Sequence, residues 1–252
     1  MNISGNTILI TGGGSGIGRA LAEAFQKSGN HVIIAGRRQK ALDETTAANP
    51  GMASAILDIE DAQSIRSFAI AVQKSHPSLN VVIHNAGIMR PEDVKAGKLD
   101  DAEATITTNL LGPIRLTAAL LPGLLAQPQA AILTVSSGLA FLPLALTPTY
   151  CATKAAIHSY TESLRYQLRD SSVQVIELIP PYVQTELLSE QGATDPNAMP
   201  LNDFIAETMS LLKNSPDAKE ICVERVKPLR FAEAGGNYDQ IFQTLNAQFA
   251  AH

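Results

Sequence analysis

Short apolar runs alternate with longer amphipathic stretches along most of this 252-residue chain. Runs that are apolar at successive positions are typical of strands buried on both faces, and a three- to four-residue apolar spacing is typical of helices. Strands are expected at residues 8–10, 32–35, 53–57, 81–83, 132–135 and 173–179, and helices at 17–27, 39–48, 62–74, 101–125 and 149–168. The pattern predicts an α/β fold, with a doubly wound parallel sheet as the middle of three layers in a single domain.

Composition narrows the class of protein. Hydrophobic residues make up 45% of the chain and charged residues 17%, which is enough apolar surface for one sizeable core. The net charge of −5 disfavours nucleic acid and anionic membranes as partners. Two cysteines, Cys151 and Cys222, are expected to be free thiols, and no apolar run is long enough for a signal sequence or a membrane span. A cytoplasmic location is therefore expected.

The alternation weakens after residue 179. Prolines and glycines in the following segment suggest a substrate lid at about 187–213, with a helix over 201–213. An edge strand at 221–223 and a helix at 238–249 are expected to complete the fold. The lid is expected to give the substrate an apolar wall made of Leu187, Leu188, Met199, Leu201 and Phe204.

A glycine-rich loop, residues 11–18, follows the first expected strand and opens the first helix. Glycine allows a sharp turn and a close approach of the backbone to a pyrophosphate, and the helix start offers free N–H groups. The alternative is a glycine-rich turn with no ligand. The place of the glycine-rich loop between a strand and a helix favours dinucleotide binding in a Rossmann fold. The expected contacts are Gly12, Ser15, Gly16, Ile17 and Gly18.

The second strand ends in Gly36-Arg37-Arg38. An acidic residue here binds the ribose of NAD, whereas two guanidinium groups suit the 2′-phosphate of NADP. The alternative is a pair of solvated arginines, although cations at a helix start oppose its dipole and favour an anion nearby. Arg37 and Arg38 therefore predict NADP(H) as the preferred cofactor, with NAD(H) still possible.

Two further strand ends carry candidate cofactor contacts. Asp58 follows the third strand, where it either accepts a hydrogen bond from the adenine amino group or caps the next helix, with Asp61 as the competing cap. Asn85, Ala86 and Gly87 follow the fourth strand. Their small side chains either let the backbone lie against the cofactor or form an ordinary turn.

Candidate catalytic residues cluster around the fifth strand. Tyr150 and Lys154 are four apart on one expected helix, so they share a face, and an ammonium group lowers the pKa of a neighbouring phenol. Ser136 and Ser137 stand at the carboxyl end of the strand, where a hydroxyl either holds a substrate oxygen or belongs to a polar turn. Asn109 interrupts an apolar helix, where a buried amide needs partners, and this favours a functional role.

In this order and spacing, these residues resemble the short-chain dehydrogenase/reductase family in its compact form, over residues 7–188. The resemblance implies that Tyr150 is the general acid or base and that Ser137, thirteen residues before it, binds the substrate oxygen. It also implies that Lys154 lowers the tyrosine pKa and binds the nicotinamide ribose, that Asn109 positions a water, and that Thr185 bonds the nicotinamide carboxamide.

Two positions depart from the family pattern. His84 stands where an asparagine is common, and Pro181 where glycine is usual, which changes the contacts expected near the nicotinamide. The segment 226–231 is similar to the DltE-type oxidoreductases of the family. The resemblance also implies a homodimer or homotetramer formed through the helices that carry Asn109 and Tyr150.

The sequence therefore predicts an NADP(H)-dependent enzyme that moves a hydride between nicotinamide and a small carbonyl or secondary alcohol substrate. The histidines, His158 among them, lack metal-ligand spacing and are expected on the surface or in packing, so no metal site is expected. One alternative is an NADP(H)-binding sensor with little turnover. Another is a sugar-nucleotide epimerase or dehydratase, for which the C-terminal region is short.

Overall fold

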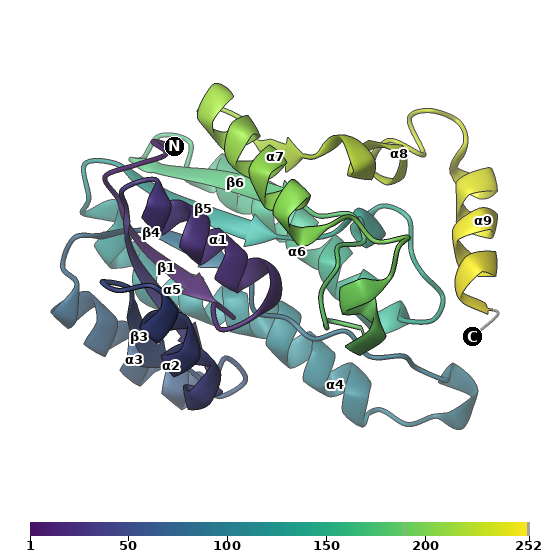
Figure 1. Ribbon diagram of the computed structural model, residues 1–252, viewed down its shortest axis with the longest axis horizontal. Helices are drawn as coiled ribbons and strands as arrows, with labels where there is room; N and C mark the ends of the chain where they lie inside the picture. The colour runs from purple at the N-terminus through teal and green to yellow at the C-terminus, as the bar shows by residue number, and fades with distance from the viewer. Residues whose placement is uncertain (189, 251–252) are drawn as a thin grey trace.

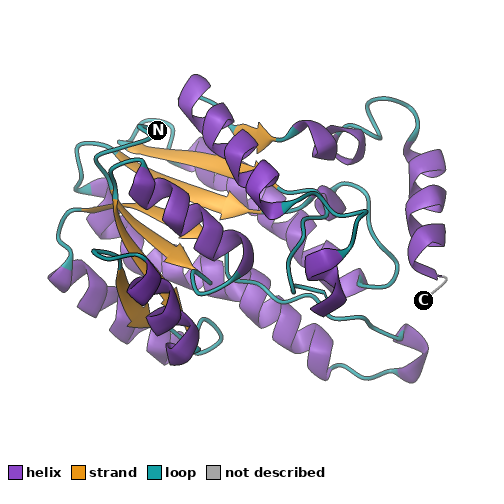
Figure 2. Ribbon diagram, viewed as in Figure 1, coloured by secondary structure: helices purple, strands orange, loops and turns teal. Residues whose placement is uncertain are grey.

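A seven-stranded parallel sheet forms the centre of the protein, whose computed structural model describes residues 1–188 and 190–250 (Figures 1 and 2). The strand order is β3-β2-β1-β4-β5-β6-β7, and every neighbouring pair is parallel. The strands β1 to β3 are added in order toward one edge of the sheet and β4 to β7 toward the other edge. The boundary between β1 and β4 is therefore the switch point of a doubly wound fold. The strands are β1 (Thr7–Thr11), β2 (His31–Gly36), β3 (Ala53–Ile56), β4 (Leu79–His84), β5 (Ala130–Val135), β6 (Val173–Ile179) and β7 (Glu220–Cys222). The predicted single-domain Rossmann fold is confirmed.

Two hydrophobic clusters cover the two faces of the sheet, because successive side chains of a strand point to opposite sides. Ile8 and Ile10 of β1 pack with the layer formed by α1 (Gly16–Lys27), α2 (Gln39–Ala48) and α7 (Leu201–Asn214). Leu9, between them, packs with the layer formed by α3 (Ala62–Ser75), α5 (Gly112–Leu125) and α6 (Pro148–Gln167). The three predicted layers are therefore present (Figure 2).

The helix expected over 101–125 is present but is not uniform. It consists of α4 (Asp100–Ile106), a π-helical turn (Thr107–Leu111) and α5. Asn109 lies in the π turn and is 2% exposed. Such turns are inserted into helices where a side chain must be redirected, often at functional sites.

The C-terminal region departs in part from expectation. It contains short 3₁₀ turns, the helix α8 (Lys227–Arg230), which was not predicted, and α9 (Tyr238–Ala250). Of the expected substrate wall, Met199 and Phe204 are instead buried in the core with α1, while Leu187 is exposed. The expectation was therefore wrong for these two core residues. Ser189, within the predicted lid, lies outside the described residues.

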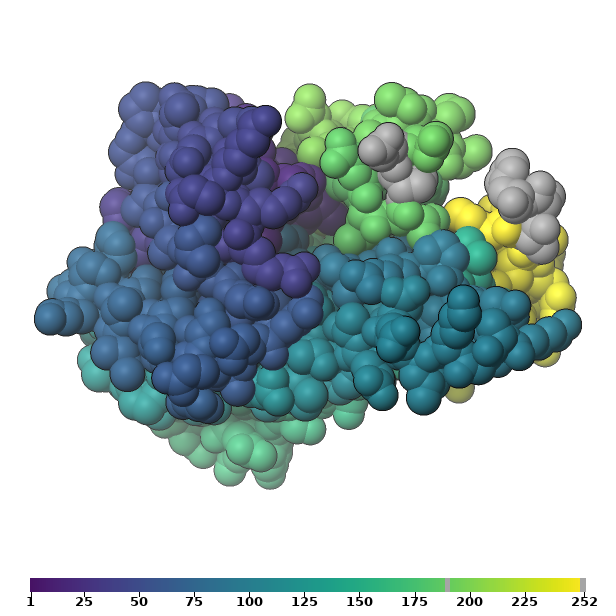
Figure 3. Space-filling model, turned by 90° about the horizontal axis from the view of Figure 1, so that it is seen from below, coloured from purple at the N-terminus to yellow at the C-terminus, as the bar shows by residue number. Residues whose placement is uncertain are grey.

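Other 3₁₀ turns connect the main elements, at Val94–Ala96, Gly138–Ala140, Glu190–Thr194 and Glu224–Val226. Cys151 and Cys222 are free thiols, as expected. Within the described ranges, no helix combines the length and the apolar character that crossing a bilayer requires. In space-filling view, a recess separates the N-terminal segments in purple and blue from the green segment around α7 (Figure 3).

Candidate functional site

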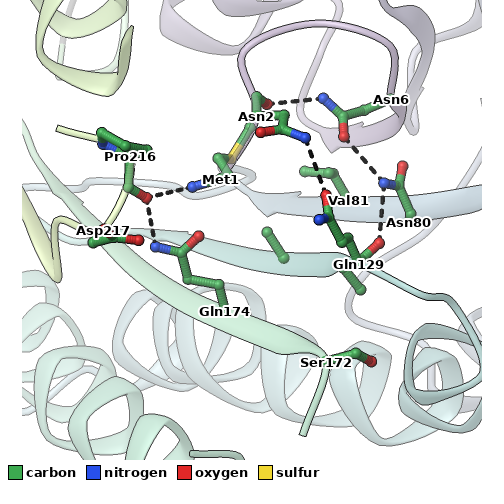
Figure 4. A pocket seen from close by; sticks show the side chains of 12 residues that line it. Met1, Asn2, Asn6, Asn80, Val81, Gln129, Ser172, Gln174, Pro216 and Asp217 are labelled. Carbon is green, nitrogen blue, oxygen red and sulfur yellow. Dashed lines mark hydrogen bonds between the residues drawn. The ribbon is translucent and has the colours of Figure 1, made fainter. Parts of the chain in front are cut away.

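The predicted site residues gather at the carboxyl edge of the sheet, beyond the ends of β1, β2, β4 and β5. A cavity of about 220 Å³ lies at the opposite, amino edge (Figure 4). There the amides bond one another: Asn2 donates to Gln129 Oε1 at 3.0 Å, and Asn80 donates to Asn6 Oδ1 at 3.0 Å. The amino-edge cavity contains none of the predicted site residues, so the candidate site is the carboxyl edge.

The glycine loop is too tight for larger residues. A Cβ added to Gly18 would lie 2.3 Å from the carbonyl oxygen of Gly12, and Gly12 itself has a φ of +68°. Ser15 precedes α1 but makes no side-chain cap, so its hydroxyl leaves the first N–H groups of the helix open to a ligand. This close-packed turn at an open helix start fits the pyrophosphate of a dinucleotide.

Thr11, at the end of β1, holds the loop after β4 against the glycine loop. Its hydroxyl oxygen accepts hydrogen bonds from the backbone N–H groups of Asn85 and Ala86, both at 3.0 Å. The Asn85 side chain donates back to the Thr11 carbonyl at 3.0 Å. Sequence reasoning identified Asn85 but gave Thr11 no role of its own; a hydroxyl at the last strand position was the available signal.

The two arginines after β2 have different partners. Arg38 Nη2 donates to the Ser15 hydroxyl of the glycine loop at 3.1 Å. Arg37 forms an ion pair with Glu60 at 2.7 Å, and Glu60 also accepts from Thr108 at 2.9 Å. Arg38 is thus directed toward the glycine loop, whereas Arg37 is tied to the start of α3. Glu60 was not identified from the sequence.

The choice between Asp58 and Asp61 as the cap of α3 is resolved. Asp61 is the N-cap, and its carboxylate accepts from the N–H of Gln63 at 2.8 Å. The Asp58 carboxylate accepts from the N–H of Glu60 at 3.0 Å, and the Asp58 backbone N–H donates to the Ser64 hydroxyl at 3.2 Å. Asp58 is therefore not the helix cap.

Asn109 joins the loop after β4 to the helix that carries Tyr150. Its amide oxygen accepts from the N–H of Ile88 at 2.8 Å, and its amide nitrogen donates to the Ile88 carbonyl at 2.8 Å. The same nitrogen lies 3.3 Å from the hydroxyl of Thr153, which donates to the Tyr150 carbonyl. A Cβ on Gly87 would lie 3.2 Å from the Asn109 oxygen. The buried amide thus has the partners that it requires.

Tyr150 and Lys154 lie on successive turns of α6, as predicted. Lys154 Nζ is 5.5 Å from the centroid of the Tyr150 ring and donates to the Val135 carbonyl at 2.7 Å. Burial lowers the pKa of Lys154 to about 8, and the negative charge of Glu177 opposes that shift. Burial also raises the pKa of Tyr150, which a hydrogen bond with Ser137 partly offsets. Both groups are 5% exposed, so they interact in a medium of low polarity.

The structure places Ser137, rather than Ser136, against the Tyr150 phenol. Ser137 Oγ also accepts from the N–H of Leu139 at 3.1 Å, which fixes its orientation. Ser136 Oγ is buried and has no hydrogen-bond partner among the described residues. Thr185 lies beside the glycine loop, since a Cβ on Gly16 would be 3.5 Å from its methyl carbon.

His84 lies in the core below the site. Its Nε2 is 2.9 Å from the Thr117 hydroxyl, while Nδ1 has no partner in the described part of the chain. Burial lowers the pKa of His84 to about 4. The imidazole is therefore neutral at physiological pH.

An apolar cluster packs around Tyr150. Leu144 and Cys151 are buried with it, and Leu245 and Phe249 of α9 pack against the group. Three more partly buried side chains complete the cluster: Met89, Leu139 and Leu146. The C-terminal helix α9, rather than α7, supplies apolar side chains to the cluster that contains Tyr150. No periodicity in the sequence indicates that contact.

Comparison with known proteins places this geometry in a family. The sequence pattern of short chain dehydrogenases matches residues 6–196. The uncharacterized oxidoreductase DltE of Bacillus subtilis (strain 168) is 41% identical over 256 residues, covering 98% of this chain and 99% of that protein.

Solved structures agree on the fold. A short chain dehydrogenase from Burkholderia cenocepacia J2315 in complex with NADP is similar with a TM-score of 0.81 and 23% identity, over 97% of this chain and 99% of that one. A short chain dehydrogenase/reductase from Burkholderia phymatum in complex with NAD also has a TM-score of 0.81, with 21% identity over 95% and 96% of the two chains. The chain belongs to the short-chain dehydrogenase family, and within it is an oxidoreductase of the DltE type.

Proposed function

We propose that this protein is an NADP(H)-dependent oxidoreductase that transfers a hydride between nicotinamide and a carbonyl or secondary alcohol substrate. One observation carries the proposal: the Tyr150 phenol is hydrogen-bonded to Ser137 and the Lys154 ammonium lies over its ring, at the sheet edge where the glycine loop also lies. A hydroxyl, a phenol and a cation in a water-poor site are suited to proton transfer at a substrate oxygen.

The cofactor is held by the loops that end β1, β2, β3 and β4. Gly12, Gly16 and Gly18 shape the pyrophosphate turn, with Ser15 and Ile17 at the open start of α1. Asp58 meets the adenine, while Asn85, Ala86 and Gly87 form the floor, and Thr185 bonds the carboxamide. Arg38, directed to Ser15, selects the 2′-phosphate with Arg37 in support, so NADP(H) is preferred over NAD(H).

The bound nicotinamide supplies the hydride in reduction and accepts it in oxidation. Tyr150 protonates the developing alkoxide, or removes the alcohol proton in the reverse direction. Ser137 donates a hydrogen bond to the same oxygen. Lys154 stabilises the phenolate and binds the nicotinamide ribose, and Asn109 positions a water for the proton that returns to Lys154.

The substrate is a small molecule with an apolar body. Leu144, Leu245 and Phe249 belong to the apolar cluster that contains Tyr150, and residues 187–213 form a lid. The protein acts in the cytoplasm as a homodimer or homotetramer through α5 and α6. Two apolar side chains on these helices, Leu125 and Tyr166, are 45% and 68% exposed in the single chain.

The test is NADPH oxidation with a panel of carbonyl substrates, alongside NADH. Tyr150→Phe is expected to lower turnover by about 10³-fold or more while keeping NADPH binding, because it removes only the proton donor. Tyr238→Phe at the start of α9 is the control, since it removes a phenol hydroxyl outside the proposed catalytic residues and outside the helices of the proposed interface, and should leave turnover unchanged. Full activity in Tyr150→Phe would overturn the mechanism. Tight NADPH binding with no turnover on any substrate would favour the sensor alternative.

A further inference from the structure

Glu177 is a carboxylate in the interior of the sheet. It lies in β6, between β5 and β7, and its side chain is fully buried. Its Oε1 atom has no hydrogen-bond partner among the described residues. A buried carboxylate is strongly unfavourable unless another charge or donor compensates it, so this position requires an explanation.

The other carboxylate oxygen of Glu177 contacts α6. His158 Nδ1 lies 2.8 Å from Glu177 Oε2, and the imidazole donates to the carboxylate when its proton is on Nδ1. The expectation that His158 serves only surface or packing contacts was therefore incomplete. Its ring also packs edge-on against Phe141, which fixes its plane.

The same helix face carries Lys154, one turn before His158. Glu177 pairs in register with Thr134, and the next residue of β5, Val135, accepts the hydrogen bond from Lys154 Nζ. Thr134 and Glu177 both face α6, since Thr134 bonds Thr161 there. Lys154 Nζ, bonded to β5, and the Glu177 carboxylate of the adjacent strand β6 therefore lie under the same helix, and among the described residues no direct ion pair joins them.

The other charged groups around His158 have partners of their own. Glu220 of β7 binds Arg230 through both oxygens at 2.9 Å, and Cys222 lies 3.9 Å from Glu220. On α6, Glu162 lies 3.8 Å from His158 Nε2. Arg165 of α6 donates to the carbonyls of Val175 and Lys219.

A divalent cation between His158, Glu177 and Glu220 would lie beside the Arg230 guanidinium, so charge repulsion argues against a metal site here.

We propose that Glu177 is the counter-ion of the Lys154 ammonium, and that His158 holds the Glu177 carboxylate in place under α6. Both are positioning residues for the Tyr150–Lys154 pair, so the inference rests on the proposed function. Lys154 is buried and carries a charge that its hydrogen bond to a carbonyl does not neutralise. Glu177 opposes the effect of that burial on the lysine pKa.

The inference predicts how Lys154 titrates in variants. In Glu177→Gln the ammonium loses its counter-ion, so the lysine pKa falls and the alkaline limb of kcat/KM moves to lower pH. In His158→Leu neither Glu177 oxygen has a hydrogen-bond partner, so the carboxylate is no longer held under α6 and the Lys154 pKa falls in the same way. His158→Asn retains an N–H donor and should restore the lysine titration toward that of the wild type.

The direct measurement is an NMR titration of lysine labelled with ¹³C at Cε, with the Lys154 signal assigned by Lys154→Met. The midpoint is expected to fall by about one pH unit, a tenfold loss of proton affinity, in Glu177→Gln and in His158→Leu. The double variant should fall no further, because the two residues act in series. Glu162→Gln, on the exposed side of His158, is the matched control and should change nothing.

An unchanged Lys154 midpoint in Glu177→Gln, or additive shifts in the double variant, would overturn the inference. If Glu177→Gln does not fold, His158→Leu carries the same test, and thermal unfolding monitors all variants. The titration and the pH dependence of NADPH binding need no turnover. A moved Lys154 midpoint in a protein without reductase activity would therefore retain the counter-ion role and reject the proposed function. An unchanged midpoint in a protein with reductase activity would reject the counter-ion role and retain the proposed function.

Discussion

The amide nitrogen of Asn109 lies 3.3 Å from the hydroxyl oxygen of Thr153, and this contact joins the π-helical turn to the helix that carries Tyr150. Thr153 donates in turn to the Tyr150 carbonyl at 2.7 Å. Asn109 also bonds both backbone groups of Ile88. One buried amide thus fixes the loop after β4 relative to α6.

Asn109→Ala should therefore weaken both folding and catalysis. Removal of the amide leaves buried polar groups without partners, which reduces the free energy of unfolding by about 2 kcal/mol, whereas Thr153→Val costs about 1 kcal/mol. Turnover should fall by about tenfold or more in Asn109→Ala, because the proton-transfer groups lose their alignment. Urea unfolding and steady-state kinetics measure the two effects. Strictly additive losses in the double variant would contradict a direct contact.

Arg38 and Arg37 should contribute unequally to cofactor choice. Arg38→Gln is expected to raise the KM for NADPH by about 10- to 100-fold, because a charged hydrogen bond contributes about 1.5–3 kcal/mol. The KM for NADH should stay unchanged. Arg37→Gln should have a smaller effect, since Arg37 is paired with Glu60. Kinetics with both nucleotides check this.

Glu60→Gln is the matched variant for that comparison. It removes the charge that holds Arg37, so Arg37 becomes available to the 2′-phosphate and the KM for NADPH should fall or stay the same. A large rise in the KM for NADPH in Glu60→Gln, or equal losses in the two arginine variants, would reject the division of roles.

Local patterns were sufficient to predict most of the fold. The helix expected over 39–48 is α2 (Gln39–Ala48), and the edge strand expected at 221–223 is β7 (Glu220–Cys222). Period and turn residues act over a few positions, so they are readable from one sequence. The π turn and α8 were missed because a one-residue shift in helical bonding and a four-residue helix leave no period to detect.

The site was predictable where residues lie near each other in the chain. Tyr150 and Lys154 share a helix, and Ser137 lies two residues after the end of the preceding strand, as the N-cap of a 3₁₀ turn. Contacts between distant segments were not predictable, because side-chain type does not specify a partner. The pairing of Arg37 with Glu60 and the packing of Phe249 near Tyr150 are of this kind.

His84→Asn should make the protein more resistant to acid. The pKa of His84 is about 4 in the folded protein and near 6.5 when exposed, so the unfolded chain binds an extra proton between these values. Stability is therefore fully present above pH 6.5 and is lost as pH falls toward 4. An asparagine does not titrate, and its amide can still bond Thr117. Between pH 7.5 and 4.5, the free energy of unfolding in urea should fall by about 2–3 kcal/mol less for the variant than for the wild type. Parallel losses would reject the assignment.

Lys154→Met should stabilise the protein while it removes activity. The lysine pKa is about 8 when folded against 10.5 in the unfolded chain, so the unfolded chain binds one more proton between pH 8 and 10.5. Wild-type stability consequently rises with pH through that window, and below pH 8 the folded state carries the whole cost of a buried ammonium. Methionine has a similar length and no charge, so the variant should gain roughly 1–3 kcal/mol at pH 7.

That gain should shrink as pH rises from 8 and vanish above pH 10.5, because both side chains are then neutral in the folded and the unfolded state. Denaturant unfolding at pH 7 and pH 10, with the exposed Lys74→Met as control, separates this effect from a general change in hydrophobicity. A gain of equal size at both pH values would assign the stabilisation to packing rather than to charge. A loss at pH 7 would mean that the charge of Lys154 is already compensated in full, in which case Glu177 and the Val135 carbonyl together outweigh the burial of the ammonium.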